Sequence, residues 1–383
     1  MQRTAFLLVA CGTFAAARVQ AEQFVFTPPT ADRWHYGFNS TPGSRPIGST
    51  FMAPGSVGIN SDFNDRDAFV ILAWDTSGVI TPGQPLESYN ISSIGLTVTC
   101  APGGQWVPDA TVDEWYTYDL NGDGMINADG IPRGAPGDSD GESSDPDPGR
   151  TIDIYGVGFG PTYTAATWTE GSAYIGSMYS GFPYFGDPVA ARDPFPFVFQ
   201  DGSLDMLHVE DHIRGLQNDM LANPVYEFTP HPWAIGDVVG YTPGSQTVPF
   251  DVHFSIDLSL SAGAVKQYFQ EQLAAGKIFI IVSAAHETVM MGGQESYPNI
   301  YMREAVGSIT GAKAAVLNLD LAAVPGDYDG DGDADLADFA AFPNCLTGPV
   351  DAYTDPDCAP FDFDTDGDVD LSDFASFQGV LGQ

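Results

Sequence analysis

Two twelve-residue segments near the end of the chain repeat one pattern of carboxylates. The first spans residues 327–338, and the second, 362–373, begins thirty-five residues later. Each has Asp at positions 1, 3, 5, 7, 9 and 12, Gly at position 6 and an apolar residue at position 8. With this spacing one chain wraps around one Ca²⁺: the carboxylates, one backbone carbonyl and a bridging water supply oxygens, and the Gly allows a sharp turn. The repeat therefore predicts two calcium sites.

The predicted ligands are all aspartates. They are Asp327, Asp329, Asp331, Asp333, Asp335 and Asp338 in the first loop, and Asp362, Asp364, Asp366, Asp368, Asp370 and Asp373 in the second. The alternative is a disordered acidic tail, since residues 327–373 contain fifteen Asp and no Lys, Arg or His. Random acidity would not place Gly, and the apolar Ala334 and Val369, at matching positions, so we favour the calcium sites.

The residues around the two loops carry a resemblance to a known family. Pro325 and Pro360 stand just before the loops, where proline disfavours an entering helix. Each loop is followed by a segment predicted to be helical with two Phe three residues apart, 339–342 and 374–377; each pair shares a helix face and can pack the two halves together. The pair resembles a dockerin module, in which two loop-plus-helix half EF-hands bind Ca²⁺ and dock onto a cohesin protein.

The match to the dockerin pattern is incomplete outside the calcium loops. Positions 10 and 11, polar in dockerins, are Leu336-Ala337 and Leu371-Ser372 here. In dockerins a Lys or Arg also follows the loop, whereas no Lys or Arg follows Lys313 in this chain. We also expect Pro343 to shorten the first helix. The resemblance thus implies calcium binding and a partner that is a cohesin-like or cell-surface protein, whereas the departures at these positions count against docking onto a cohesin.

The start of the chain has the pattern of a secretory signal. A basic residue, Arg3, precedes an apolar run at 5–17, and the small residues Val19 and Ala21 form a cleavage pattern. A lipoprotein cleavage box ending at Cys11 is the alternative, although it leaves a short apolar core. We predict a signal peptide at 1–21, a main domain at 22–323, a calcium-binding domain at 324–383, and an extracellular, secreted protein.

The charge of the chain restricts its partners. The formal net charge is −38, which repels nucleic acid and anionic membranes and attracts cations. No other apolar run is long enough to cross a bilayer. After removal of the signal three Cys remain, of which Cys345 and Cys358 bracket the linker between the loops and are predicted to form a disulfide. Cys100 is then an odd thiol, expected to be a small buried apolar residue.

The main domain is predicted to be mainly β, a β-sandwich or jelly roll with one or two helices. Apolar or alternating runs predict strands at 68–74, 94–100, 151–157, 249–258, 277–284 and 314–319. Helical spacing predicts a helix at 262–275, stopped by Gly276, and a weaker one at 207–221. Many strands with few helices favour two packed sheets.

A second resemblance concerns the first strands of this domain. Residues 66–77 and 89–98 resemble the opening strands of secreted bacterial jelly-roll modules of the disaggregatase-related type, which are similar to carbohydrate-binding modules. The whole region 22–323 also resembles uncharacterised secreted bacterial proteins with a dockerin-like tail. These resemblances imply a polysaccharide as a partner and a role in polysaccharide catabolism.

A third loop interrupts the main domain. Asp119, Asn121 and Asp123 occupy positions 1, 3 and 5 of a calcium-loop pattern over 119–129, but Gly130 stands at position 12. The alternative is an ordinary Asn-Gly/Asp-Gly turn. We therefore predict a third Ca²⁺ site there only if the missing carboxylate comes from Asp129 or from elsewhere.

No catalytic motif is visible. The sequence has no nucleophile elbow, phosphate-binding loop or dinucleotide fingerprint. His208 and His212 are four residues apart and would share a helix face, but Glu210 is misplaced for a zinc protease motif. His286 and Glu287 end an apolar strand, where we favour strand-end polar groups; the alternative is a general base.

These features leave two functions open. Aromatic residues are dense between Trp168 and Phe199 and either fill the core or stack on sugar rings. We favour a secreted, non-catalytic, calcium-binding protein whose tail anchors a binding or structural domain. The alternative is a polysaccharide-active enzyme, a glycosyl hydrolase or lyase, or a carbohydrate-binding module, and it rests on association with dockerins alone.

Overall fold

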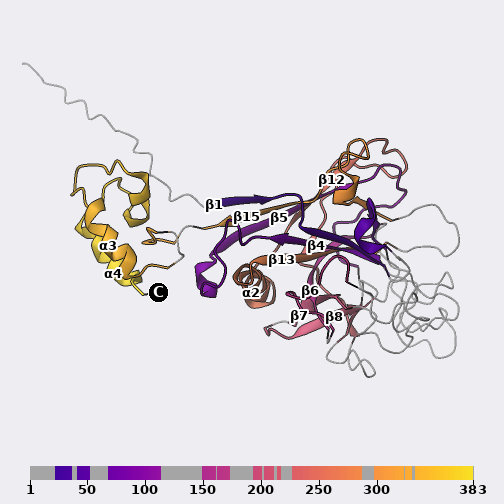
Figure 1. Ribbon diagram of the computed structural model, residues 1–383, viewed down its shortest axis with the longest axis horizontal. Helices are drawn as coiled ribbons and strands as arrows, with labels where there is room; N and C mark the ends of the chain where they lie inside the picture. Colours follow the sequence, from indigo (N-terminus) through magenta and orange to yellow (C-terminus); the bar gives the residue numbers. More distant parts are fainter. Residues whose placement is uncertain are drawn as a thin grey trace, which may run out of the picture. The chain divides into compact units, whose positions relative to one another are not determined.

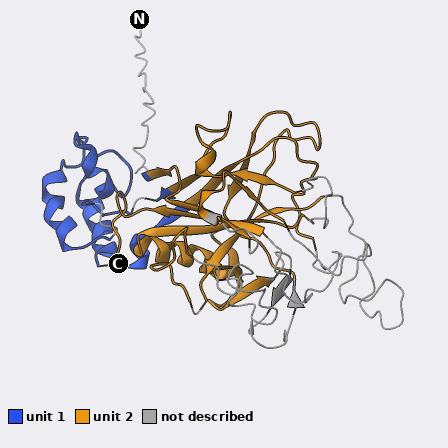
Figure 2. Ribbon diagram, turned by 45° about the vertical axis from the view of Figure 1, so that its right-hand side comes forward, with its two compact units in different colours: residues 1–22, 84–92, 320–383 blue, residues 23–83, 93–319 orange. Residues whose placement is uncertain are grey.

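The structure is a computed structural model that divides into two compact units, coloured separately in Figure 2. One unit comprises 1–22, 84–92 and 320–383, and the other 23–83 and 93–319. The predicted boundary at residue 324 stays a prediction. The structure describes residues 22–36, 41–51, 68–113, 149–160, 162–172, 193–200, 202–210, 214–216, 227–286, 297–322, 324–329 and 333–382.

The described part of the chain is mainly β, as predicted, and forms two sheets (Figure 1). The larger sheet has nine strands in the order β10-β9-β8-β7-β6-β13-β4-β2, with β11 paired to β6. Its strands are β2 (Ala31–Tyr36), β4 (Ala68–Asp75), β6 (Ile152–Gly158), β7 (Phe195–Phe199), β8 (Met206–Glu210), β9 (Arg214–Leu216), β10 (Glu227–Phe228), β11 (Ala234–Ile235) and β13 (Lys277–Ala284).

The smaller sheet has six strands in the order β1-β15-β5-β14-β3, with β12 paired to β5. Its strands are β1 (Glu22–Phe26), β3 (Ile47–Ser49), β5 (Ile91–Cys100), β12 (Phe250–Ser255), β14 (Asn299–Tyr301) and β15 (Val316–Leu321). Every strand pairing whose register is described in either sheet is antiparallel. The six strands predicted from apolar runs are all confirmed.

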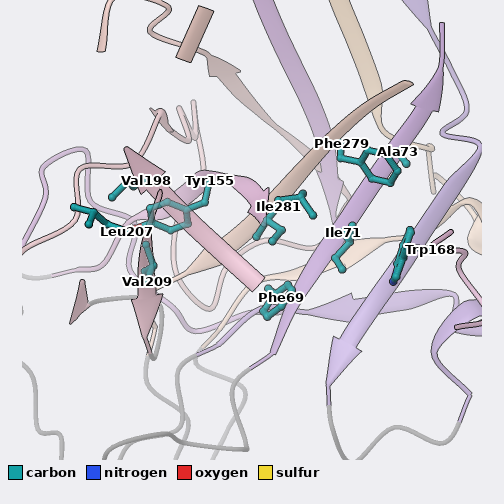
Figure 3. Close-up of a cluster of buried hydrophobic side chains, with 11 residues drawn as sticks. Phe69, Ile71, Ala73, Tyr155, Trp168, Val198, Leu207, Val209, Phe279 and Ile281 are labelled. Carbon is teal, nitrogen blue, oxygen red and sulfur yellow. The ribbon is translucent and has the colours of Figure 1, made fainter. Parts of the chain in front are cut away.

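One face of the nine-stranded sheet carries a continuous apolar cluster. The register sets Ile281 on β13 opposite both Ile71 on β4 and Tyr155 on β6. Alternate residues of a strand share a face, so Phe69 on β4 and Phe279 on β13 lie on the same face as this row (Figure 3). Central strands with apolar residues on both faces are buried on both sides, which explains why their sequences show unbroken apolar runs.

The other face of this sheet packs on the helix α2 (Leu260–Ala274), which confirms the helix predicted at 262–275 (Figure 1). Val265, Phe269 and Leu273 are buried at four-residue spacing, as predicted. The Tyr268 hydroxyl donates to the carbonyl of Phe279 at 3.0 Å, which fixes the helix to β13. The helix ends where predicted, because Gly276 has a left-handed φ of 77°.

The weaker helix predicted at 207–221 is wrong, because strand pairing overrides its helical spacing. Residues of this segment form β8 and β9 instead. Leu207 and Val209 point into the apolar cluster, whereas His208 pairs with Phe197 on β7. A two-residue alternation of this kind satisfies a strand, not a helix.

The C-terminal module contains two helices and a compact aromatic core. The helices α3 (Leu336–Cys345) and α4 (Leu371–Val380) each follow a calcium-type loop, and the 3₁₀ helix η5 (Pro356–Phe361) lies between them in sequence. As predicted, the Phe pairs join the halves: the ring of Phe342 lies 5.3 Å from that of Phe374 and 5.4 Å from that of Phe377.

The predictions about the cysteines and about Pro343 have clear outcomes. The disulfide between Cys345 and Cys358 is confirmed, and Cys100 is buried as a free thiol. The expectation that Pro343 shortens α3 is wrong: the helix continues past it and matches α4 in length, at ten residues. The remaining short 3₁₀ helices in the described residues are η1 (Pro42–Ser44), η2 (Leu86–Ser88) and η4 (Arg303–Ala305).

Candidate metal centres

The position-12 carboxylates organise the two C-terminal loops. Both Asp338 and Asp373 are completely buried. In the first loop, Asp338 Oδ1 accepts from the backbone N–H of Tyr328 at 2.6 Å and of Asp329 at 3.2 Å, and its Oδ2 accepts from that of Asp335 at 2.7 Å. The carboxylate thus closes the loop onto the start of α3.

The second loop repeats this hydrogen-bond pattern atom for atom. Asp373 Oδ1 accepts from the N–H groups of Phe363 at 2.8 Å and Asp364 at 3.3 Å, and its Oδ2 accepts from that of Asp370 at 2.8 Å. A carboxylate that is buried without a positive partner is costly, so these backbone donors are needed to hold it in place.

The position-9 aspartates begin the two helices. Asp335 Oδ1 accepts from the N–H of Ala337 and Asp370 Oδ1 from that of Ser372, each at 2.6 Å. In return, the Asp338 side chain accepts from the backbone N–H of Asp335, and the Asp373 side chain accepts from that of Asp370. Each helix therefore begins with a capping box. One residue pair in each loop therefore both starts the helix and faces the cation position.

Most of the predicted ligands come together. In each loop the position-12 carboxylate belongs to two groups of three aspartates, with one oxygen from each member within 4.8 Å of the others. The groups are Asp327-Asp329-Asp338, Asp333-Asp335-Asp338, Asp362-Asp364-Asp373 and Asp368-Asp370-Asp373. Oxygen-only sets of this kind suit a hard cation such as Ca²⁺.

Two predicted ligands stand outside these groups. Asp331 lies outside the described residues. Asp366 holds the loop backbone instead: its N–H donates to Asp362 Oδ1 at 3.2 Å, and its Oδ1 accepts from the N–H of Asp368 at 3.1 Å. The apolar position 8 is Ala334 in one loop and Val369 in the other, and both side chains are buried in the module core.

Electrostatics in the second loop oppose full ionisation when no cation is bound. Burial raises the pKa of Asp362, and the charge of Asp373 raises it further, against the lowering effect of the N–H groups of Gly367 and Asp366. Burial and the neighbouring carboxylates likewise raise the pKa of Asp368. Its Oδ1 is buried and accepts no hydrogen bond. A bound cation would compensate these charges.

The other predicted sites are less well supported. The third loop, with Asp119, Asn121 and Asp123, lies outside the described residues, as do His212 and Glu287. His208 is buried on a strand, with its ring 5.1 Å from that of Phe195, so no helix face pairs it with a second histidine. Burial lowers the pKa of His286 to about 3, and its Nε2 lies 3.1 Å from the carbonyl of Val107, which favours a neutral structural residue.

The aromatic residues of 168–199 that the structure describes serve mainly for packing. Trp168, Phe195 and Phe197 are buried, which removes their faces from contact with a sugar ring. The structure also shows one group that sequence reasoning missed: Asp32, Glu170 and Glu304 bring carboxylate oxygens within 4.8 Å of one another. Their wide separation in the chain gave no signal.

Comparison with known proteins adds no assignment. No protein-family model matches the chain, and no curated protein matches it in sequence. Among the helices that the structure describes, none combines the length and apolar character needed to span a bilayer. Conclusions about function therefore depend on the residues and geometry described above.

Proposed function

We propose that the protein is a secreted, non-catalytic calcium-binding protein whose dockerin-like C-terminal module folds around two Ca²⁺ ions and attaches the β-sandwich to a partner protein or to the cell surface. The supporting observation is the duplicated network around Asp338 and Asp373. Each buried carboxylate accepts three backbone N–H groups and stands among four further aspartates.

The charge balance explains why an ion is needed. Residues 327–373 contain fifteen Asp and no basic side chain. The apolar core of the module is small, so burial alone offsets little of the repulsion and chain entropy. Binding energy from the metal then becomes folding energy, as in other small metal-dependent domains. Because extracellular modules can use weak sites at high ambient Ca²⁺, this proposal is compatible with export.

Two exposed leucines support the attachment role. Leu336 and Leu371 occupy position 10 in the two loops and the first turn of the two helices, and their side chains are 72% and 77% exposed. Exposed apolar side chains at equivalent positions are suited to contact with an apolar partner surface. Calcium would present them by ordering the loop that precedes each helix.

Calcium uptake is tested by calorimetry on the mature chain. The Asp327→Ala/Asp362→Ala variant should bind two fewer ions per chain than the parent, and its C-terminal helices should form no more in Ca²⁺ than in chelator. Asp351→Asn is the matched control, since Asp351 is an exposed aspartate of the same module outside both loops. Unchanged uptake by the double-alanine variant would refute the calcium sites.

Attachment is tested on the washed surface of the cells that produce the protein. Binding should require Ca²⁺ and should fall in the Leu336→Asp/Leu371→Asp variant. Val350→Asp is the control, because Val350 is 88% exposed in the same module but lies outside α3 and α4. If the leucine variant takes up Ca²⁺ and still attaches as well as the parent, these leucines are not the contact surface.

A further inference from the structure

Three carboxylates from distant parts of the chain meet around one arginine in the sandwich. Asp32 lies on the edge strand β2, Glu170 follows β6, and Arg303 and Glu304 form η4. One oxygen from each acid lies within 4.8 Å of the others. The residues all belong to the unit of 23–83 and 93–319.

Arg303 contacts all three acids but supplies one positive charge. Its backbone N–H donates to Asp32 Oδ2 at 2.5 Å, and its Nε donates to Glu304 Oε1 at 3.1 Å. Its Nη2 is paired with Glu170 Oε2. Arg303 Nε also lies 3.4 Å from Asp32 Oδ1, as an ion pair without a hydrogen bond. When the acids are ionised, their three negative charges exceed the single charge of Arg303, and the buried Arg33 also acts on Glu170.

One oxygen of each carboxylate is left without a hydrogen-bond donor. Asp32 Oδ1, Glu170 Oε1 and Glu304 Oε2 are all buried, and none accepts a hydrogen bond. The side chain of Asp32 is only 1% exposed. Buried carboxylate oxygens without donors are costly because they have lost water and gained nothing in return. The three carboxylates that carry these oxygens lie in one cluster, and a cation would supply the partner that the oxygens lack.

The group is held in place by its surroundings. Strand pairing sets Asp32 opposite Leu72 on β4. Arg33 Nη1 donates to the backbone carbonyls of Glu170 and Ser172, which fixes the segment that carries Glu170 over β2. Glu170 also lines a pocket of about 370 Å³ between this segment and the sheet.

We propose that Asp32, Glu170 and Glu304 bind a divalent cation, Ca²⁺, in the β-sandwich, at a site independent of the C-terminal loops. All available ligands are oxygens, which suits a hard cation rather than a soft transition metal. Arg303 donates a hydrogen bond to one oxygen of each acid and none to the other, although its Nε also lies 3.4 Å from Asp32 Oδ1. The ion would tie the edge strand β2 to η4 and to the segment after β6.

Terbium luminescence separates this site from the tail, because Tb³⁺ substitutes for Ca²⁺ and is sensitised by nearby tryptophan. None of the six tryptophans follows residue 233, whereas Trp168 is two residues from Glu170. In the full mature chain carrying Asp327→Ala and Asp362→Ala, tryptophan excitation should still give Tb³⁺ emission that Ca²⁺ displaces. Adding Glu170→Gln and Glu304→Gln should abolish that emission.

Two controls decide the origin of the signal. Glu271→Gln alters an exposed glutamate of α2 and should leave the emission unchanged. Asp119→Ala/Asp123→Ala removes the third loop, which is near Trp115 in sequence, and should also leave it unchanged. Near-ultraviolet circular dichroism confirms that each variant is folded. Loss of emission in the Asp119 variant, retention in the glutamine variant, or no emission in the starting protein would each overturn the proposal.

Discussion

Asp338 and Asp373 are the same residue of one structural unit used twice: each is buried at the end of its loop and accepts three backbone N–H groups from equivalent residues. The duplication extends to the capping boxes at the starts of α3 and α4. Because the two halves share one core, disruption of one loop is expected to affect the other.

Asp373→Ala should remove one Ca²⁺ site and weaken the second. The substitution deletes a predicted ligand and leaves three N–H groups of the loop without an acceptor, at about 1–3 kcal/mol for each group that stays buried. Calorimetric titration should show one ion fewer, with the remaining ion bound less tightly. Asp357→Ala, at an exposed residue of the same module, is the control. Wild-type stoichiometry in Asp373→Ala would contradict the assignment.

Loss of the disulfide should destabilise the module. Cys345 ends α3 and Cys358 lies in η5, and the bond closes a loop with a sequence separation of 13. Loops of this length contribute about 3 kcal/mol by restricting the unfolded chain. Cys345→Ala/Cys358→Ala should lower the midpoint of the module's thermal transition in Ca²⁺. An unchanged midpoint in this variant would show that the disulfide adds no stability. The third cysteine, Cys100, is buried and should resist alkylation until the protein unfolds.

The aromatic core of the module should show a clear difference between two phenylalanines. Phe377 is fully buried against Phe342 and Phe361, whereas Phe339 is 39% exposed. Phe377→Ala should cost about 3–5 kcal/mol of unfolding free energy. Phe339→Ala, the same change at a partly exposed position, should cost much less. Chemical denaturation in saturating Ca²⁺ measures both; equal losses would mean that this core does not hold the halves together.

The unfolding free energy of the sandwich should depend on pH because of Asp153. This residue is buried on β6 beside Thr151 and Tyr155, and burial raises its pKa from 3.8 to about 7. Between these pH values the folded state keeps a proton that the unfolded state releases. The contribution of Asp153 to the unfolding free energy is therefore fully present below about pH 4 and is lost as pH rises through 7. The loss amounts to a few kcal/mol.

Asp153→Asn tests this sign, because asparagine keeps the shape without the charge. The variant should lose less unfolding free energy between pH 4 and pH 8 than the parent. Asp257→Asn, at an exposed residue of the same unit, should follow the parent's pH profile. Identical profiles for Asp153→Asn and parent would refute the assignment.

Local chemistry made much of the fold predictable. Apolar runs such as 68–74 and 277–284 identified central strands, because residues buried on both faces leave no polar alternation. Prediction failed at 207–221, where a helical spacing was overridden by pairing between β7 and β8. It failed again at Pro343, which is accommodated near the end of a helix stabilised by its cap and core.

The sequence by itself determined the calcium-type loops and the disulfide partners, because these features depend on spacing within a short stretch of chain. Only the tertiary structure brought Asp32, Glu170 and Glu304 together, since strand register and the hold of Arg33 on a distant segment decide which far-apart residues become neighbours. Short-range geometry is encoded residue by residue, whereas contacts across more than a hundred residues follow from how the sheets pair and pack.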